Sequence, residues 1–113
     1  MNCRNTVTLI GHLGQDCEVF KFDSGSQKAR FTLATSERYA NAKGEMVTST
    51  DWHKCEAWGK PVDTMEKYFK KGKELAIQGS LHTENYTDRD GNKRSRTFVR
   101  VNSFAFIGKK QEA

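Results

Sequence analysis

Hydrophobic and polar residues alternate along most of this 113-residue chain, and this period of two is typical of strands. Gly, Asp and Asn separate the alternating stretches, as expected for turns. In one stretch Ala29, Phe31 and Leu33 share a parity, which predicts a buried face. The predicted strands cover residues 6–13 with a continuation at 18–22, then 27–36, 50–58, 74–86 and 94–107.

One segment has helical spacing instead. Val62, Met65 and Phe69 fall at i, i+3 and i+7, which makes a single apolar stripe. Pro61 fits a first helical position, where its missing N–H costs nothing, and Gly72 can close the helix. The segment therefore predicts a short helix that depends on tertiary packing.

The order of elements is three strands, a short helix and two strands. Residues 41–47, which contain Lys43-Gly44, predict an exposed loop, and residues 88–93, with Asp90-Gly91 at their centre, predict a tight turn. This order predicts an all-β fold, a five-stranded Greek-key barrel of the OB type with the helix between strands 3 and 4. We expect one domain over residues 1–108 and a short polar end at residues 109–113.

Composition narrows the function. Nineteen Lys and Arg against 14 Asp and Glu give a formal charge of +5, which favours a polyanionic partner. No apolar run approaches the ~20 residues that cross a bilayer, and no apolar leader is present, so we expect a cytoplasmic protein without a membrane partner. Cys3, Cys17 and Cys55 lack metal-ligand spacing, and we interpret them as reduced thiols.

The same inspection predicts a protein that is not an enzyme. It finds no nucleophile–base pair, no metal cluster and no Gly-rich phosphate loop in the sequence. We therefore expect no catalytic residue, no cofactor and no bound metal.

The aromatic residues carry the most information. Trp52 and Trp58 share a parity with Lys54 and Glu56, so they are expected on a wet face rather than in the core. Tyr86 falls on the polar parity of the fourth strand. Tyr39 is expected in a loop, in a basic setting.

Exposed aromatic rings in this number favour single-stranded nucleic acid, because unpaired bases stack on them whatever their sequence. A single exposed Trp more often packs at a barrel rim or a subunit interface, and only the set of four shifts the balance. Phe98 shares a parity with Arg96 and Arg100, and for Phe98 we favour a core position over a stacking one.

With these residues in place, the chain closely resembles the bacterial single-stranded DNA-binding protein family, from Asn5 to about Gly108. Each matching motif is weak alone, but their order and spacing are specific. The motifs are Val7-Thr8-Leu9-Ile10-Gly11-His12-Leu13-Gly14-Gln15-Asp16, Phe31-Thr32-Leu33-Ala34-Thr35-Ser36-Glu37-Arg38-Tyr39, Thr50-Asp51-Trp52-His53-Lys54-Cys55-Glu56-Ala57-Trp58-Gly59-Lys60, Tyr68-Phe69-Lys70-Lys71-Gly72, Ile77-Gln78-Gly79-Ser80-Leu81 and Tyr86-Thr87-Asp88-Arg89-Asp90-Gly91.

The resemblance implies non-specific binding and protection of single-stranded DNA during replication, recombination and repair. It implies base stacking on the aromatic residues and, together with their settings, phosphate contacts from five basic residues. It also implies a homotetramer with His53 at an interface. The expected stacking residues are Tyr39, Trp52, Trp58 and Tyr86, and the expected phosphate contacts are Lys43, Lys54, Lys60, Lys73 and Arg94.

Two matters stay open. Family members typically carry a long flexible tail with an acidic end that recruits repair and replication enzymes, whereas this chain stops at Gln111-Glu112-Ala113, either because the tail has been truncated or because the chain is a short paralogue. We expect this chain to coat DNA without tail-mediated recruitment. The alternative function is that of another OB-type binder, either a primosomal replication-restart protein or an RNA-binding module.

Overall fold

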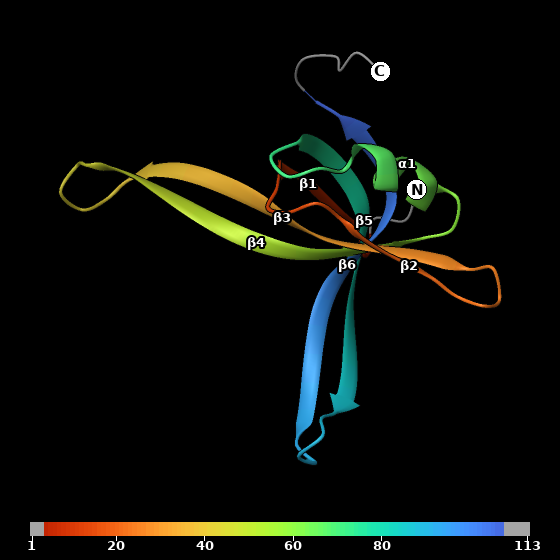
Figure 1. Ribbon diagram of the computed structural model, residues 1–113. Coiled ribbons are helices and arrows are strands. Elements are labelled where there is room, and N and C mark those ends of the chain that lie inside the picture. The colour runs from red at the N-terminus through yellow and green to blue at the C-terminus, as the bar shows by residue number, and fades with distance from the viewer. Residues whose placement is uncertain (1–3, 108–113) are drawn as a thin grey trace.

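Six strands and one helix account for most of residues 4–107, the part of the chain that this computed structural model describes (Figure 1). Cys3 and the predicted polar end at residues 109–113 lie outside the described residues. The elements are β1 (Val7–Leu13), β2 (Glu18–Lys21), β3 (Gln27–Ala40), β4 (Met46–Trp58), α1 (Pro61–Tyr68), β5 (Glu74–Thr87) and β6 (Lys93–Phe106).

The strands close into a barrel in the order β1-β5-β6-β4-β3. All neighbours are antiparallel except β4 and β6, which run parallel where Cys55 pairs with Val99. The barrel closes where His12 and Leu13 of β1 pair with Ala34 and Leu33 of β3. β2 also pairs with β3 and follows β1 after a short break, so β1 and β2 together form the first predicted strand. The five-stranded barrel with a helix between strands 3 and 4 is confirmed.

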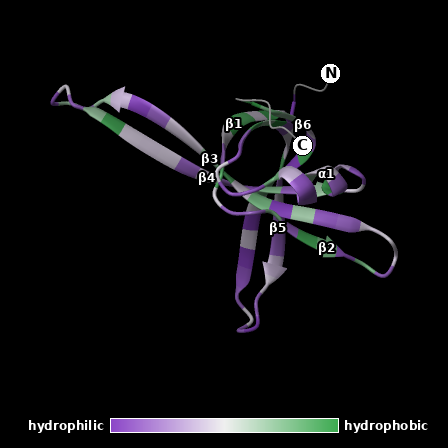
Figure 2. Cartoon of the chain, turned by 45° about the horizontal axis from the view of Figure 1, so that its top comes forward, coloured by the Kyte–Doolittle hydropathy of each residue, from purple (hydrophilic) through white to green (hydrophobic). Residues whose placement is uncertain are grey.

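The barrel interior is filled by alternate residues of each strand, with α1 closing one end. The ring of Phe69 is fully buried and makes edge-on contacts at 5.1 Å with Phe31 and with Phe104. Figure 2 shows hydrophobic segments gathered around the barrel, while the projecting hairpins are mostly hydrophilic to neutral. The buried core cluster consists of Leu13, Ala29, Phe31, Leu33, Cys55, Ala57, Val62, Met65, Phe69, Leu75, Ile77 and Val99.

The helix is shorter than its apolar stripe predicted. It ends at Tyr68, and Phe69 leaves the helical conformation with φ −83° and ψ 81°, while its N–H still donates to the Met65 carbonyl at 2.8 Å. Gly72, with φ +86°, belongs to the turn that follows rather than to the end of the helix. Phe69 is nevertheless buried, with its ring against Phe31 and Phe104 in the barrel interior.

Two long hairpins project from the barrel in different directions (Figure 1). β3 and β4 pair without interruption out to Ala40 and Met46, and β5 and β6 pair out to Thr87 and Lys93. The radius of gyration is 16.4 Å, compared with about 13 Å for a compact domain of this length. The predicted loop at residues 41–47 was therefore too long, because Met46 and Val47 are already in β4.

A β-bulge lies where β5 and β6 leave the barrel. Gln78 pairs with Ser103 but Gly79 pairs with Val101, so Asn102 is the extra residue on β6. The carbonyl of Arg100 lies so close to Gly79 that a Cβ there would collide with it. The bulge reverses which parity of β6 faces the interior: Val99 points inward before it, and Phe104 packs against the core after it.

Candidate nucleic-acid interface

The outer face of the barrel carries a row of aromatic and basic side chains on β4. Trp52, Lys54 and Trp58 alternate with the buried Cys55 and Ala57, so they point away from the core. Trp52 is 61% exposed, which makes it the most exposed large hydrophobic side chain in the described part of the chain. Trp52, Lys54 and Trp58 therefore lie on the solvent-exposed face of β4, as the sequence predicted.

The Trp52 side chain packs against the barrel at one place. Its six-membered ring lies against the α-carbon of Gly14, so closely that a Cβ at Gly14 would collide with it. Thr32, on the neighbouring strand, borders the same spot. Glycine at position 14 thus lets the six-membered ring of the indole approach the barrel backbone closely, while most of the Trp52 surface stays exposed.

Tyr86 lies near Trp52 across a groove. It sits on the β5–β6 hairpin opposite Arg94 and is half exposed. A groove of about 410 Å³ is lined by residues of β4, β5 and β6. The structure thus brings two of the four predicted stacking residues and one predicted phosphate contact together. The lining of this groove includes Trp52, Lys54, Tyr86, Arg96 and Phe98.

Trp58 is more firmly packed than Trp52. Its ring stacks on Phe22, with centroids 5.8 Å apart and planes 17° from parallel, and the Lys28 ammonium lies 5.4 Å from its centroid. Lys28 also pairs with Glu56 at 3.3 Å, and Glu56 is only 4% exposed although it lies on the outer face. Trp58 therefore offers a ligand one end of an aromatic cluster rather than a free ring.

Tyr39 is not in a loop, as the sequence analysis expected, but in β3, where it pairs with Val47. The β3–β4 register has no bulge between this pair and the pair of Ala34 with Trp52. Positions 34 and 39 differ in parity, so Tyr39 lies on the opposite face of the hairpin from Trp52. The role of Tyr39 in stacking stays a prediction that requires a strand of DNA to pass around the hairpin.

Phe98 is buried, as favoured from the sequence, but it does not belong to the core cluster. It lies on the outer face of β6 before the bulge, opposite His82 of β5. The Arg96 guanidinium lies 4.7 Å from its ring centroid and that of Arg100 lies 5.9 Å away. Its burial comes from these cations and from His82 rather than from the barrel interior.

The other predicted phosphate contacts are spread over the molecule. Lys43 lies at the tip of the β3–β4 hairpin, and Lys60 lies at the N-terminus of α1. Lys73 lies over the ring of Phe106, at the opposite end of β5 from Tyr86. The structure therefore does not bring these three to the groove, and their DNA contacts stay predictions.

Arg94 pairs with Tyr86 in the β5–β6 hairpin and lines a separate hollow with it, but it already has a partner. Its Nε donates to the Asp88 carboxylate at 2.9 Å, and this hydrogen bond, with the backbone N–H of Asn92, lowers the pKa of Asp88. Asp88 is thus ionised near neutral pH. A phosphate would have to compete with it for Arg94.

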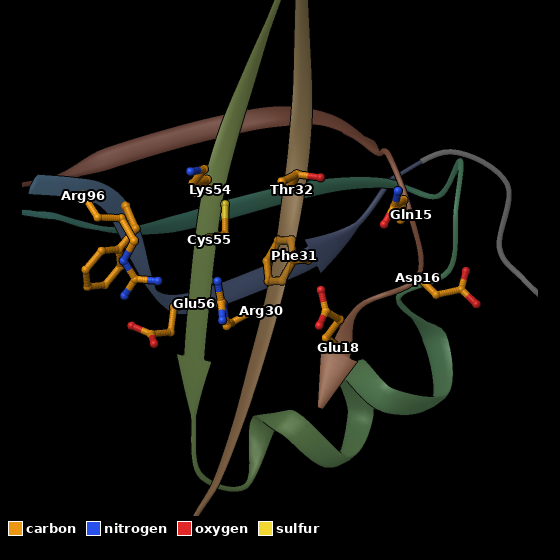
Figure 3. Close-up of a pocket in the computed structure, with 11 residues that line it drawn as sticks. Gln15, Asp16, Glu18, Arg30, Phe31, Thr32, Lys54, Cys55, Glu56 and Arg96 are labelled. Atoms are coloured by element: carbon orange, nitrogen blue, oxygen red, sulfur yellow. The ribbon is translucent and has the colours of Figure 1, made fainter. Parts of the chain in front are cut away.

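Two cations on the same face, Arg30 and Arg96, were not among the predicted phosphate contacts, whereas Lys54 was. Arg30 and Lys54 line a smaller pocket of about 130 Å³ together with Arg96 (Figure 3). Arg30 lies on the parity of β3 opposite to Ala29 and Phe31, which are buried. That alternation was readable in the sequence and could have identified Arg30 as a residue of the outer face.

His53, expected at a subunit interface, lies on the inner parity of β4. Its Nε2 is 2.9 Å from the Thr35 hydroxyl, and its side chain is partly buried. The position is near the point where the β3–β4 hairpin leaves the barrel. The interface role stays a prediction.

The remaining reactive groups do not form a second site. Burial raises the pKa of the Cys55 thiol to about 12, and burial also raises that of Cys17, so both stay protonated near neutral pH. Within residues 4–107, no cluster of His, Cys, Asp and Glu has the placement of a metal site. Over the same residues, no helix is both long and apolar enough to span a bilayer.

Comparisons with known proteins agree with this geometry. Residues 4–107 match the model of the single-strand binding protein family. The single-stranded DNA-binding protein 1 of Chlorobaculum tepidum is 39% identical over 107 residues, which is 94% of this chain and 66% of that protein. The protein of the same name from Synechocystis is 38% identical over 109 residues, 96% of this chain and 87% of that one.

A solved structure is similar in fold as well. The Plasmodium falciparum SSB in complex with ssDNA has a TM-score of 0.86 and 27% sequence identity to this chain. The match covers 96% of this chain and 98% of that one.

Proposed function

This chain belongs to the single-strand binding protein family, and from that premise we infer that it binds single-stranded DNA without sequence specificity. Bases stack on the exposed rings of the outer face, and nearby Lys and Arg side chains bind the phosphates. Proteins of this family are binding proteins rather than enzymes. The role that we infer for this chain is to cover and protect single strands of DNA that are exposed in replication, recombination and repair.

One observation supports this function most. Trp52 and Tyr86 face one groove together with Lys54 and Arg96, and Trp52 contacts Gly14 through its six-membered ring while most of its surface stays exposed. An exposed ring without a partner loses apolar burial, so a set of such rings beside cations indicates a planar anionic ligand. Single-stranded nucleic acid has both properties.

Binding is expected to be selective for single strands and nearly independent of base sequence, because stacking uses the face of a base and not its edges. The two tryptophans are both exposed, so titration with poly(dT) should quench their fluorescence. Competition with duplex DNA and with poly(U) provides the comparison. Equal affinity for duplex and poly(dT) would contradict the proposal, and a preference for poly(U) would favour the RNA-binding alternative.

Salt should weaken binding steeply, since each neutralised phosphate of a single strand adds roughly −0.7 to the log–log slope of affinity against salt. The double variant Lys54→Ala, Arg94→Ala should therefore flatten the slope by up to about 1.4. A double variant of equal charge, Lys67→Ala with Lys70→Ala, changes residues in and just after α1 and should leave the slope as in the wild type. An equal slope in wild type and the first variant would remove Lys54 and Arg94 from the DNA path.

We also expect the protein to assemble with copies of itself, as a tetramer by family resemblance. Within the described residues, Val7 to Ile10 of β1 pair with β5 alone, so the other edge of this strand offers unpaired backbone groups. Ile10 beside this edge is largely exposed. Light scattering should give a mass that is a multiple of 12.9 kDa, and a monomer at micromolar concentration would contradict the expectation.

A further inference from the structure

Phe98 is an aromatic residue on the outer face of the barrel that belongs neither to the core cluster nor to the predicted stacking residues. It is only 3% exposed, yet it is outside the core cluster. It lines both the groove shared by Trp52 and Tyr86 and the smaller pocket near Arg30 and Lys54. A ring in this position connects the two hollows of the outer face.

Phe98 is covered by two long cationic side chains and an imidazole. Arg96 and Arg100 flank it on the same strand, and the Arg96 guanidinium lies over the ring at 4.7 Å. The imidazole of His82 lies beside it, 5.9 Å between centroids and 25° from parallel. A guanidinium and a nucleobase are both planar groups that stack on aromatic faces, so a base can take the place of the guanidinium.

Arg96 is held over the ring by a weak partner. Its Nη2 donates to the Glu84 carboxylate across the hairpin at 2.9 Å, and half of the Glu84 side chain is exposed. The Arg96 side chain is 24% exposed and that of Glu84 is 52% exposed, so water and salt reach the pair from the Glu84 side and weaken it. A phosphate oxygen accepts from a guanidinium with the same geometry as a carboxylate and can replace Glu84.

We propose that Phe98 and Arg96 form a nucleotide-binding subsite that is covered in the free protein. On binding, Arg96 moves from Glu84 to a phosphate of the single strand, and the uncovered Phe98 ring stacks a base between Trp52 and the Arg30–Lys54 pocket. The movement needs only rotation of a long side chain and no change of backbone. This subsite rests on the proposed binding of single-stranded DNA.

Photo-cross-linking of the wild-type protein to oligo(dT) that carries iodouracil tests the stacking directly. Peptide mass spectrometry should find adducts at Phe98 as well as at Trp52 and Tyr86. Adducts at Trp52 and Tyr86 without any at Phe98 would overturn the subsite. This measurement uses no variant and therefore does not depend on how a substitution affects folding.

Affinity measurements test the same point in two directions. Phe98→Leu keeps an apolar side chain but removes the ring, and it should weaken oligo(dT) binding at least about fivefold, the lower end for one stacked base. Glu84→Gln frees Arg96 and should strengthen binding by about 1.4- to fivefold, the range of one ion pair that water and salt screen. Glu66→Gln on α1 removes an equal charge from a pair with Lys21 and should have a smaller effect.

The outcomes separate the subsite from the proposed function. Wild-type binding with tryptophan quenching, but no effect of Phe98→Leu, would overturn the subsite alone. Equal effects of Glu84→Gln and Glu66→Gln would show that Glu84 acts only through net charge and would overturn the role given to Arg96. A wild-type protein that fails to bind oligo(dT) would contradict both the proposed function and the subsite.

Discussion

Replacing Trp52 and Tyr86 together by alanine is expected to weaken oligo(dT) binding by about 2–6 kcal/mol, since each stacked base contributes roughly 1–3 kcal/mol. Both rings line the same groove and are more than half exposed. Because neither belongs to the core cluster, thermal unfolding should change little. Binding measured by anisotropy of a labelled oligo(dT), together with a circular dichroism melt, separates lost stacking from lost folding.

Tyr68→Ala is the matched control for this loss. Tyr68 is also an exposed aromatic residue, but it packs edge-on against Phe106 on the α1 side of the barrel. Its removal should leave DNA affinity unchanged. If the folded Trp52–Tyr86 variant binds as the wild type does, the groove is not the stacking site, and a variant that fails to fold would contradict the placement of the two rings outside the core. Tyr39→Ala, measured in parallel, reports whether DNA also contacts the opposite face of the β3–β4 hairpin.

Phe69→Ala should destabilise the protein by about 3–5 kcal/mol, the usual cost of emptying a core site of a phenylalanine. The Phe69 ring closes one end of the barrel, and three other phenylalanine rings surround it, those of Phe31, Phe104 and Phe106. Few neighbours can move into the space, because the strands on either side are hydrogen-bonded to one another. The loss is a large fraction of the roughly 5–15 kcal/mol that a small domain has.

Urea unfolding followed by circular dichroism measures this effect. The adjacent Tyr68→Ala serves here too, and it should cost less than Phe69→Ala, because Tyr68 is an exposed residue whose aromatic pair with Phe106 adds only about 0.5–1.5 kcal/mol to its burial. DNA binding of Phe69→Ala should fall only in proportion to the unfolded fraction. An unchanged midpoint in urea would show that the barrel is not closed by Phe69.

The strands of the barrel could be predicted because one face of each is buried. Ala29, Phe31 and Leu33 alternate with polar residues, and the structure buries all three. The same alternation placed Trp52 and Trp58 outside. Where a hairpin leaves the barrel, both faces meet water and the alternation disappears, so residues 37–40 and 46–49 had no pattern that predicts a strand.

Phe98 shows a second limit. Phe104 and Phe106 share its parity and pack toward the core and α1, so a regular strand would carry Phe98 inward as well. One extra residue, Asn102, reverses the parity between them. A bulge depends on the bend of the strand around the barrel, and the only local sign of it was Gly79 on the neighbouring strand.

The cations of the site were predicted less well than the rings. Lys54 could be placed from strand parity, but the partners of Arg94 and Arg96 depend on which acidic residue stands across the β5–β6 hairpin. Asp88 and Glu84 take these places only once the register from Thr87 and Lys93 inward is set. Charge composition alone cannot tell an available cation from a paired one.

The two projecting hairpins also divide the molecule into parts that open independently. Their outer residues have water on both faces and bury little apolar surface. Amide protons there can exchange with solvent through local separation of two strands, at a free-energy cost well below that of global unfolding. Those of the barrel around Leu33 and Ile77 exchange only when the closed ring itself opens. Hydrogen exchange would thus resolve two stability classes in one small chain, with Tyr86 in the less protected one and Phe69 in the more protected one.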